Sequence, residues 1–278
     1  MKDLKFYSLS CCLMICLASN AQKSPEGLNG DAGSKFSVHL GAGTAAYHGD
    51  LMQSNANMFN QLSYSFNAGA SYAFIKKLRG RFDVGIQQLQ AADKKNSGAQ
   101  YKARNLSFKS TVIDLSISAE YSILNLDRYM VTPYISAGVG MMFFNPYTND
   151  ASGNKQYLRE LGTEGQGLAA YPDRKIYKKS AAQFPLGIGA KYPINENLTL
   201  QFELNYHITT TDYLDDVSLN SYPDKTLLDA RNPLTATFTW RGNEVGQGGY
   251  PKNLNLPRGN PKDKDGYLTM QVKVAYNF

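Results

Sequence analysis

The sequence predicts an all-β fold: an eight-stranded antiparallel transmembrane β-barrel with short periplasmic turns and long extracellular loops. Three observations support this prediction: about eight segments of alternating apolar and polar residues, connectors that alternate between short and long, and an aromatic terminal residue, Phe278. Side chains of a strand point alternately to the two faces of its sheet, so a strand with lipid on one side has period two. A tilted strand crosses a bilayer with roughly 9 to 11 residues, close to the length of most segments.

The alternation is clearest in the last segment, where Leu268, Met270 and Val272 alternate with Thr269 and Gln271. The same pattern recurs upstream. We expect the other strands to open near Phe36 and then to cover residues 62–74, 81–87, 113–121, 131–143, 182–192 and 198–208. The aromatic last strand resembles those preferred by the outer-membrane insertion machinery, which makes Tyr276 and Phe278 a candidate insertion signal.

The connectors distinguish a membrane barrel from a soluble sandwich, which could also supply eight half-buried strands. Three connectors are short, at residues 75–77, 124–128 and 193–197. The other four are long, at residues 50–60, 91–105, 145–179 and 210–266. Short turns on one rim and long loops on the other are typical of bacterial outer-membrane barrels, whose short turns face the periplasm. We expect the sheet to close into a barrel, because every backbone N–H and C=O group must be hydrogen-bonded in hydrocarbon and an open sheet would leave two unpaired edges.

The amino terminus predicts targeting to the outer membrane of a Gram-negative bacterium. Residues 1–21 have the charged start, apolar stretch and small-residue end of a signal peptide. We expect residues 22–33 to form a periplasmic N-terminal linker and residues 34–278 to form the outer-membrane β-barrel. All three cysteines, Cys11, Cys12 and Cys16, lie in the segment to be removed, so we expect no disulfide or thiol nucleophile in the mature chain.

Composition excludes several other classes of protein. The chain is 42% hydrophobic, which argues against wholesale disorder. Beyond the first two dozen residues no apolar run approaches the roughly 18 to 20 residues of a membrane-spanning helix. The 29 Lys and Arg residues exceed the 23 Asp and Glu residues, but they are scattered along the chain. We therefore expect outer-membrane lipid, and no nucleic acid, among the partners.

The inward positions of the predicted barrel carry charged side chains. An eight-stranded barrel is only wide enough to be filled by side chains, which favours a salt-bridged plug over a conducting or catalytic lumen. The predicted lumen charge network comprises Arg81, Asp83, Asp114, Glu120, Lys191, Glu203, His207 and Lys273.

Catalysis and metal binding have weaker support. His207 follows Glu203 by four residues on one strand face, so a base and a carboxylate could meet as in a lipid- or peptide-hydrolysing barrel enzyme. No serine has a recognisable nucleophile context, however, and we expect no enzyme activity, no catalytic residues and no cofactor. The histidines are too far apart for a zinc site.

Acidic loop ends after the first and seventh segments both neighbour the eighth strand. They offer weak calcium candidates, with ordinary solvated loop charge as the alternative. The candidates are Asp50, Asp212, Asp215 and Asp216.

The two longest loops, at residues 145–179 and 210–266, contain Tyr and Leu among Gly, Pro and Asn. Loops of this length are usually functional or disordered. We expect partial packing over the barrel mouth, and binding there rather than in the lumen, as in an adhesin or ligand-binding barrel.

Several stretches together resemble a known family. These are YHGDL at residues 47–51, TPYISAGVG at 132–140, LGTEGQG at 161–167, PLGIGAKY at 185–192, TDYLDDVS at 211–218 and RGNPKD at 258–263. Their order is similar to that of the PorG-like Bacteroidota family of outer-membrane barrels. The resemblance implies an anchor or accessory component of a type IX (Por) secretion complex, with periplasmic PorK/PorN-type ring proteins as partners. It implies no catalytic residues.

Overall fold

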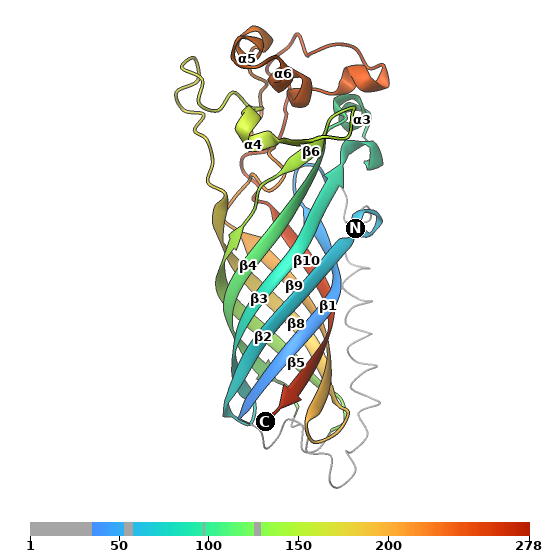
Figure 1. The fold of residues 1–278 in the computed structure, drawn as a ribbon, viewed down its shortest axis with the longest axis vertical. Coiled ribbons are helices and arrows are strands. Elements are labelled where there is room, and N and C mark those ends of the chain that lie inside the picture. Colours follow the sequence, from blue (N-terminus) through green and yellow to red (C-terminus); the bar gives the residue numbers. More distant parts are fainter. Residues whose placement is uncertain (1–34, 53–57, 97, 125–128) are drawn as a thin grey trace, which may run out of the picture.

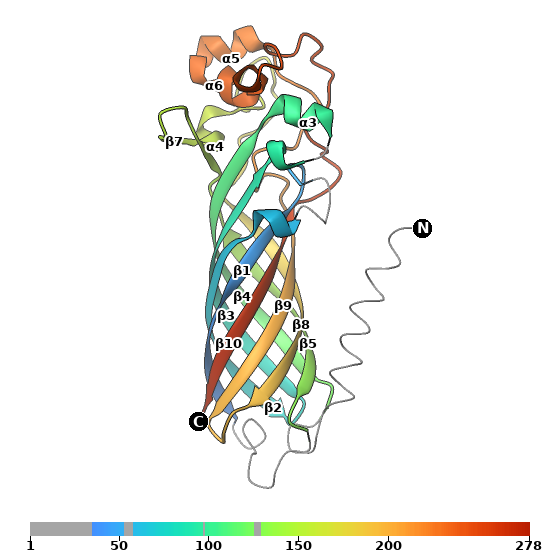
Figure 2. The same cartoon turned by 90° about the vertical axis from the view of Figure 1, so that its right-hand side faces the viewer.

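The computed structural model describes residues 35–52, 58–96, 98–124 and 129–278. The signal peptide and linker predicted for residues 1–33 lie outside the described residues. Eight long strands form a tilted barrel, and the long loops fold into a cap at one end (Figures 1 and 2). The barrel strands are β1 (Phe36–His48), β2 (Ser63–Ile75), β3 (Leu78–Ala92), β4 (Ser107–Ser122), β5 (Thr132–Phe143), β8 (Ser180–Pro193), β9 (Leu198–Thr209) and β10 (Gly266–Asn277).

The barrel is closed and antiparallel, as predicted. The strand order is β3-β2-β1-β10-β9-β8-β5-β4, and a further pairing of β3 with β4 completes the ring. The first and last strands are joined, with Thr44 opposite Met270. Every barrel strand therefore has two paired neighbours, which satisfies the backbone in a solvent that offers no hydrogen bonds.

The two faces of the wall differ in polarity. In β4 the side chains alternate between buried and exposed along almost the whole strand. Ile117 is 65% exposed, whereas its neighbours Ser116 and Ser118 are buried in the lumen. The apolar side chains face outward because the surroundings are lipid, and the polar ones fill the interior.

The β3–β4 hairpin is longer than the segments 81–87 and 113–121 predicted for it. The two strands contain 15 and 16 residues, and they rise above the rest of the rim (Figures 1 and 2). The outward face of β3 changes from Ile86 to Gln88 and Gln90, so this part of the hairpin leaves the hydrocarbon. The inward face changes in the opposite sense, from Gln87 to the buried Leu89 and Ala91, so the polarity of the two faces is inverted there.

The cap is folded, with short elements and a buried core. The elements of the cap are η1 (Phe59–Gln61), η2 (Asp93–Lys95), α3 (Ala99–Arg104), β6 (Tyr147–Asn149), β7 (Lys155–Tyr157), α4 (Leu158–Leu161), α5 (Lys225–Arg231), α6 (Pro233–Thr239) and η3 (Gly242–Val245). None of the described helices is long and apolar enough to cross a membrane. Leu158, Leu214, Val217 and Phe238 pack with Phe108 of β4 in one hydrophobic cluster, which connects the cap to the barrel.

Candidate functional site

The lumen holds a buried network of ion pairs centred on Glu203 of β9. Its carboxylate accepts hydrogen bonds from Arg81 at 2.5 and 3.2 Å and from Lys273 at 2.5 Å. The hydroxyl of Tyr134 donates to the same carboxylate at 2.7 Å. These contacts tie β9 to β3, β5 and β10 across the interior.

The other predicted lumen charges also lie inside, where each makes an ion pair or a hydrogen bond. Glu120 forms an ion pair with Lys191 at 2.7 Å, and His39 contacts Asp83 at 2.7 Å. Asp114 accepts a hydrogen bond from the hydroxyl of Tyr267 at 2.9 Å. The buried cations and anions of the described barrel strands are equal in number: Arg79, Arg81, Lys191 and Lys273 against Asp83, Asp114, Glu120 and Glu203. The network is therefore electrically balanced.

His207 does not form the dyad with Glu203 that its spacing allowed. Its Nδ1 lies 3.0 Å from Oε1 of Gln183, and its ring stacks on Tyr267 with centroids 4.1 Å apart. Glu203 is engaged by Arg81 and Lys273 instead. The Nε2 atom of His207 lies 3.4 Å from Oγ1 of Thr269, so His207 is a lumen histidine packed among polar and aromatic neighbours.

The lumen leaves almost no free space. The cavity between Arg81, Asp114 and His207 has a volume of about 30 Å³, room for about two water molecules. Two glycines make room for the network rather than for a channel. A Cβ on Gly189 would lie 2.4 Å from the ring of Tyr134, and one on Gly69 would lie 2.6 Å from Nε2 of His39.

Two basic side chains in the lumen, Arg79 and His39, were not predicted. Arg79 donates to the hydroxyls of Ser37 and Ser71 at 3.1 and 3.2 Å. It lies two residues before Arg81, so the period-two pattern already placed it on the inner face. The pairing of His39 with Asp83 depends on the register of β1, β2 and β3, which the sequence of one strand does not contain.

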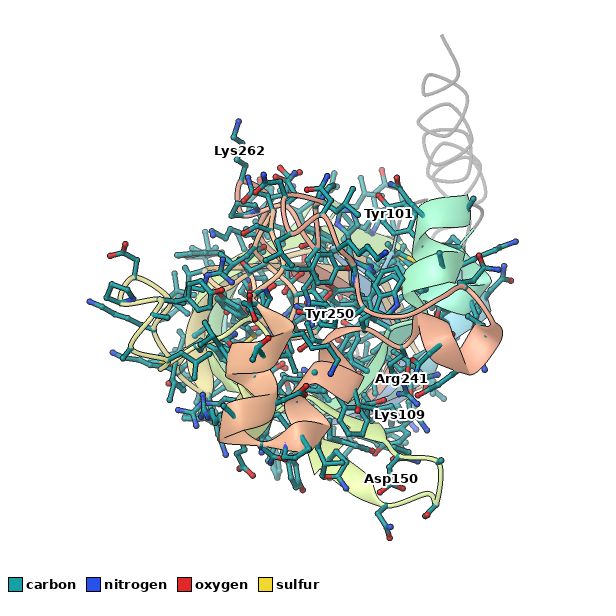
Figure 3. All side chains as sticks on the ribbon, turned by 90° about the horizontal axis from the view of Figure 1, so that it is seen from above. Tyr101, Lys109, Asp150, Arg241, Tyr250 and Lys262 are labelled. Carbon is teal, nitrogen blue, oxygen red and sulfur yellow. The ribbon has the colours of Figure 1, made fainter. Side chains whose placement is uncertain are left out.

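The cap is fastened by a second buried set of charges. Arg258, which is 2% exposed, donates to Glu164 at 2.7 Å, to the hydroxyl of Thr163 at 3.0 Å and to the carbonyl of Asp216 at 2.8 Å. Arg104 is paired with Asp93 at 2.7 Å and donates to the carbonyl of Arg258. Three extracellular loops are thereby joined above the mouth, and they cover it when the molecule is seen from above (Figure 3).

The calcium candidates lie under this cap. Asp215 and Asp265 both contact the hydroxyl of Tyr47, at 2.7 and 2.6 Å, while Asp216 accepts a hydrogen bond from Tyr177 at 2.7 Å. Asp50 accepts from the backbone of Asn260 at 2.9 Å. Within the described ranges, no group of three or more His, Cys, Asp or Glu side chains is placed to hold a metal ion. Calcium binding by Asp50, Asp212, Asp215 and Asp216 stays a prediction from the sequence.

The acidic side chains of the cap have raised pKa values, so they bind protons more readily than ordinary carboxyl groups. Burial raises the pKa of Asp212 and of Asp216 to about 7 in each case. Burial, and then the charge of Asp265, also raises the pKa of Asp215 well above its ordinary value. The Tyr47 hydroxyl has a single proton but touches two carboxyls, so one of them, Asp215 or Asp265, must itself be protonated.

We expect the cap to be more stable at pH 5 than at pH 8. Between the ordinary pKa of Asp and a pKa near 7, the folded state binds more protons than the unfolded state, so stability falls as pH rises through that window. Amide exchange in residues 161–167 and 212–218, corrected for intrinsic rates, is expected to be about thirtyfold faster at pH 8, equivalent to roughly 2 kcal/mol.

The matched variant for this measurement is Asp216→Asn, which cannot ionise and is expected to flatten part of the pH dependence. Amides of β5 serve as the internal control because they lie in the barrel wall. Equal corrected exchange of the cap at both pH values would contradict the protonated cluster.

A model of a family described as outer membrane protein beta-barrel domain matches residues 8–241 of the chain. Among curated proteins, none matches.

Solved structures of outer-membrane proteins are similar to the chain at low identity. Neisserial surface protein A is 13% identical, with 87% of this chain and 97% of that chain covered and a TM-score of 0.44. A major outer membrane protein of Thermus thermophilus is 18% identical, with 88% and 99% covered and a TM-score of 0.43. The attachment invasion locus protein Ail of Yersinia pestis, in complex with the heparin analogue sucrose octasulfate, is 10% identical, with 88% and 99% covered and a TM-score of 0.41. These likenesses carry no inference about function.

Proposed function

The chain belongs to the outer membrane protein β-barrel domain family, and from this premise we propose that it is a non-enzymatic, non-conducting barrel that acts through its exposed surfaces. It resides in the outer membrane. The closed lumen carries the proposal, because a cavity of about 30 Å³ between paired charges offers no path for a solute. Activity at His207 is not part of it, since the ring is held by Gln183 and Tyr267.

The surface that the geometry favours is the extracellular cap, acting as an adhesin or ligand-binding platform. Its loops are not extended chain but share a core, with Leu158, Leu214 and Phe238 buried. Arg258 and Arg104 fix the loops to one another. Binding residues concentrate on loops held by a rigid scaffold, and a plugged barrel is such a scaffold.

The second candidate is an anchor or accessory role in a type IX secretion complex, with PorK/PorN-type ring proteins as partners. It rests on the sequence resemblance to the PorG-like family and on one structural observation. The periplasmic turn between β2 and β3 consists of Lys76 and Lys77, and Lys76 is exposed. A basic turn is complementary to an acidic partner surface.

One experiment separates the two candidates. A tagged chain is extracted from outer membranes in mild detergent, and the proteins bound to it are identified for the native chain and two variants. The first variant replaces residues 145–179 and 211–265 by short turns, and the second carries Lys76→Glu with Lys77→Glu. We expect the first variant to insert as a barrel but to lose the bound partner, and the second to keep it.

Loss of periplasmic ring subunits in the Lys76→Glu, Lys77→Glu variant alone would favour the secretion role over the cap. Partner binding that survives both variants would contradict both candidates. Heat-dependent migration on gels confirms that each variant has formed a barrel.

A further inference from the structure

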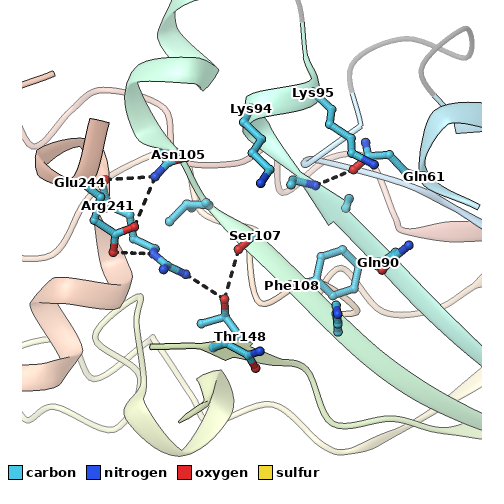
Figure 4. A pocket seen from close by; sticks show the side chains of 15 residues that line it. Gln61, Gln90, Lys94, Lys95, Asn105, Ser107, Phe108, Thr148, Arg241 and Glu244 are labelled. Atoms are coloured by element: carbon cyan, nitrogen blue, oxygen red, sulfur yellow. Dashed lines mark hydrogen bonds and ion pairs between the residues drawn. The ribbon is translucent and has the colours of Figure 1, made fainter. Parts of the chain in front are cut away.

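A groove on the flank of the cap lies where the cap meets the outer face of the barrel. It has a volume of about 420 Å³, within the range of small-molecule sites. The β3–β4 hairpin forms its floor, and η2, β6 and η3 form its sides (Figure 4). Its polar lining includes Gln90, Lys94, Asn105, Ser107, Thr148 and Arg241.

The charge of the groove is strongly positive. Lys94, Lys95, Lys109 and Arg241 line it, against the single carboxylate of Glu244. Arg241 pairs with Glu244 at 2.8 Å and also donates to the hydroxyl of Thr148 at 2.9 Å. Lys94 and Lys109 are exposed, and neither forms an ion pair within the described part of the chain. Two ammonium groups therefore remain available to a ligand.

The groove lies at a definite height relative to the membrane. On the outward face of the hairpin, the last apolar pair is Ile86 opposite Ile113, and Gln90 opposite Lys109 follows four residues further along. Four residues of strand span about 13 Å, or about 10 Å along the membrane normal at the usual tilt. The polar layer of a leaflet is roughly 5 to 8 Å thick, so the groove opens at its outer edge.

From charge, lining and height, we infer that this groove binds a phosphorylated saccharide, and that its source is the head group of an outer-leaflet glycolipid. The ammonium groups of Lys94 and Lys109 attract the phosphate oxygens. The amides of Gln90 and Asn105 and the hydroxyl groups beside them offer hydrogen bonds to sugar hydroxyls. The inference rests on the proposed function of the cap as a binding platform, and it names the chemical class of the ligand.

The test uses the full chain in detergent, titrated with bisphosphorylated lipid A or with lipid A freed of its phosphates, and native mass spectrometry counts the bound lipid. We expect the phosphorylated form to bind about tenfold more tightly, and Lys94→Gln with Lys109→Gln to remove that preference. The matched control removes two exposed lysines elsewhere on the cap, with Lys178→Gln and Lys252→Gln, and is expected to keep the preference.

A preference that persists in the Lys94→Gln, Lys109→Gln variant, or equal binding of the two lipids by the native chain, would overturn the inference. A further arm uses glucosamine 6-phosphate as the competitor. If this soluble sugar phosphate displaces lipid A completely and binds the native chain as tightly, the phosphosaccharide site stands and its assignment to the leaflet is overturned.

Discussion

Replacement of Glu203 by alanine is expected to lower the free energy of unfolding of the barrel by about 3 to 5 kcal/mol. Glu203 is 1% exposed and is the shared acceptor for Arg81, Lys273 and Tyr134. Removing it leaves two buried cations facing each other in a medium of low dielectric, with one anion fewer among them. Leaving a buried charge without its partner costs far more free energy than the intact ion pair contributes to stability.

Urea unfolding in lipid vesicles, followed by far-ultraviolet circular dichroism, measures this effect. Gln201→Ala is the matched control because Gln201 is also buried and inward-facing on β9 but carries no charge. Its expected loss is about 1 kcal/mol, the usual size for a point substitution that leaves no buried charge unpaired. The double variant Glu203→Ala, Lys273→Met is expected to lose less than Glu203→Ala alone, since it restores the charge balance. Equal losses for Glu203→Ala and Gln201→Ala would show that the network is not a unit.

The wall of the barrel could be predicted because one physical requirement acts on every residue of it. Lipid outside and a polar interior force period two, so Ile113, Asp114 and Leu115 reveal their faces without any partner. The alternation weakens where that requirement ends. At Gln87 and Gln88 both faces of β3 are polar, and beyond them the pattern is inverted, with Leu89 buried inside and Gln90 facing outward.

The sequence predicted which residues point into the lumen better than it predicted which of them contact one another. Period two placed Arg81 and Glu203 inside, but their contact crosses the barrel between strands β3 and β9, which are not neighbours in the sheet. That choice depends on the size and stagger of the closed ring, which no single segment specifies. For the same reason the sequence did not show that Glu203 and His207, which share a strand face, have different partners.

The cap was the least predictable part, because loop residues obey no period. Glu164 and Arg258 lie in different loops, and each resembles an ordinary surface charge in the sequence. Only the folded loops show that Glu164 is 0% and Arg258 is 2% exposed, and that the two are 2.7 Å apart.

That contact supports the second large prediction: Arg258→Ala is expected to unfold the cap while leaving the barrel intact. The substitution removes hydrogen bonds to Glu164, Thr163 and the carbonyl of Asp216, and it leaves the buried Glu164 without its cation. We expect the local stability of the cap to fall by about 3 to 5 kcal/mol. The barrel strands depend on their own ladders and lumen network, so their unfolding transition is expected to stay in place.

The two units can be observed separately because Trp240 is the single tryptophan of the chain and lies beside Tyr222 in the cap, with ring centroids 5.9 Å apart. Its fluorescence during urea unfolding reports the cap, whereas circular dichroism reports the barrel.

Lys252→Ala, at an exposed site on the same loop, is the control and is expected to change neither signal. The double variant Glu164→Gln, Arg258→Met should recover part of the loss, since a glutamine oxygen still accepts from the backbone of Ser218 and Leu219 and residue 164 no longer carries a charge that needs Arg258. Coincident transitions of both signals in Arg258→Ala would instead mean that cap and barrel unfold as one unit.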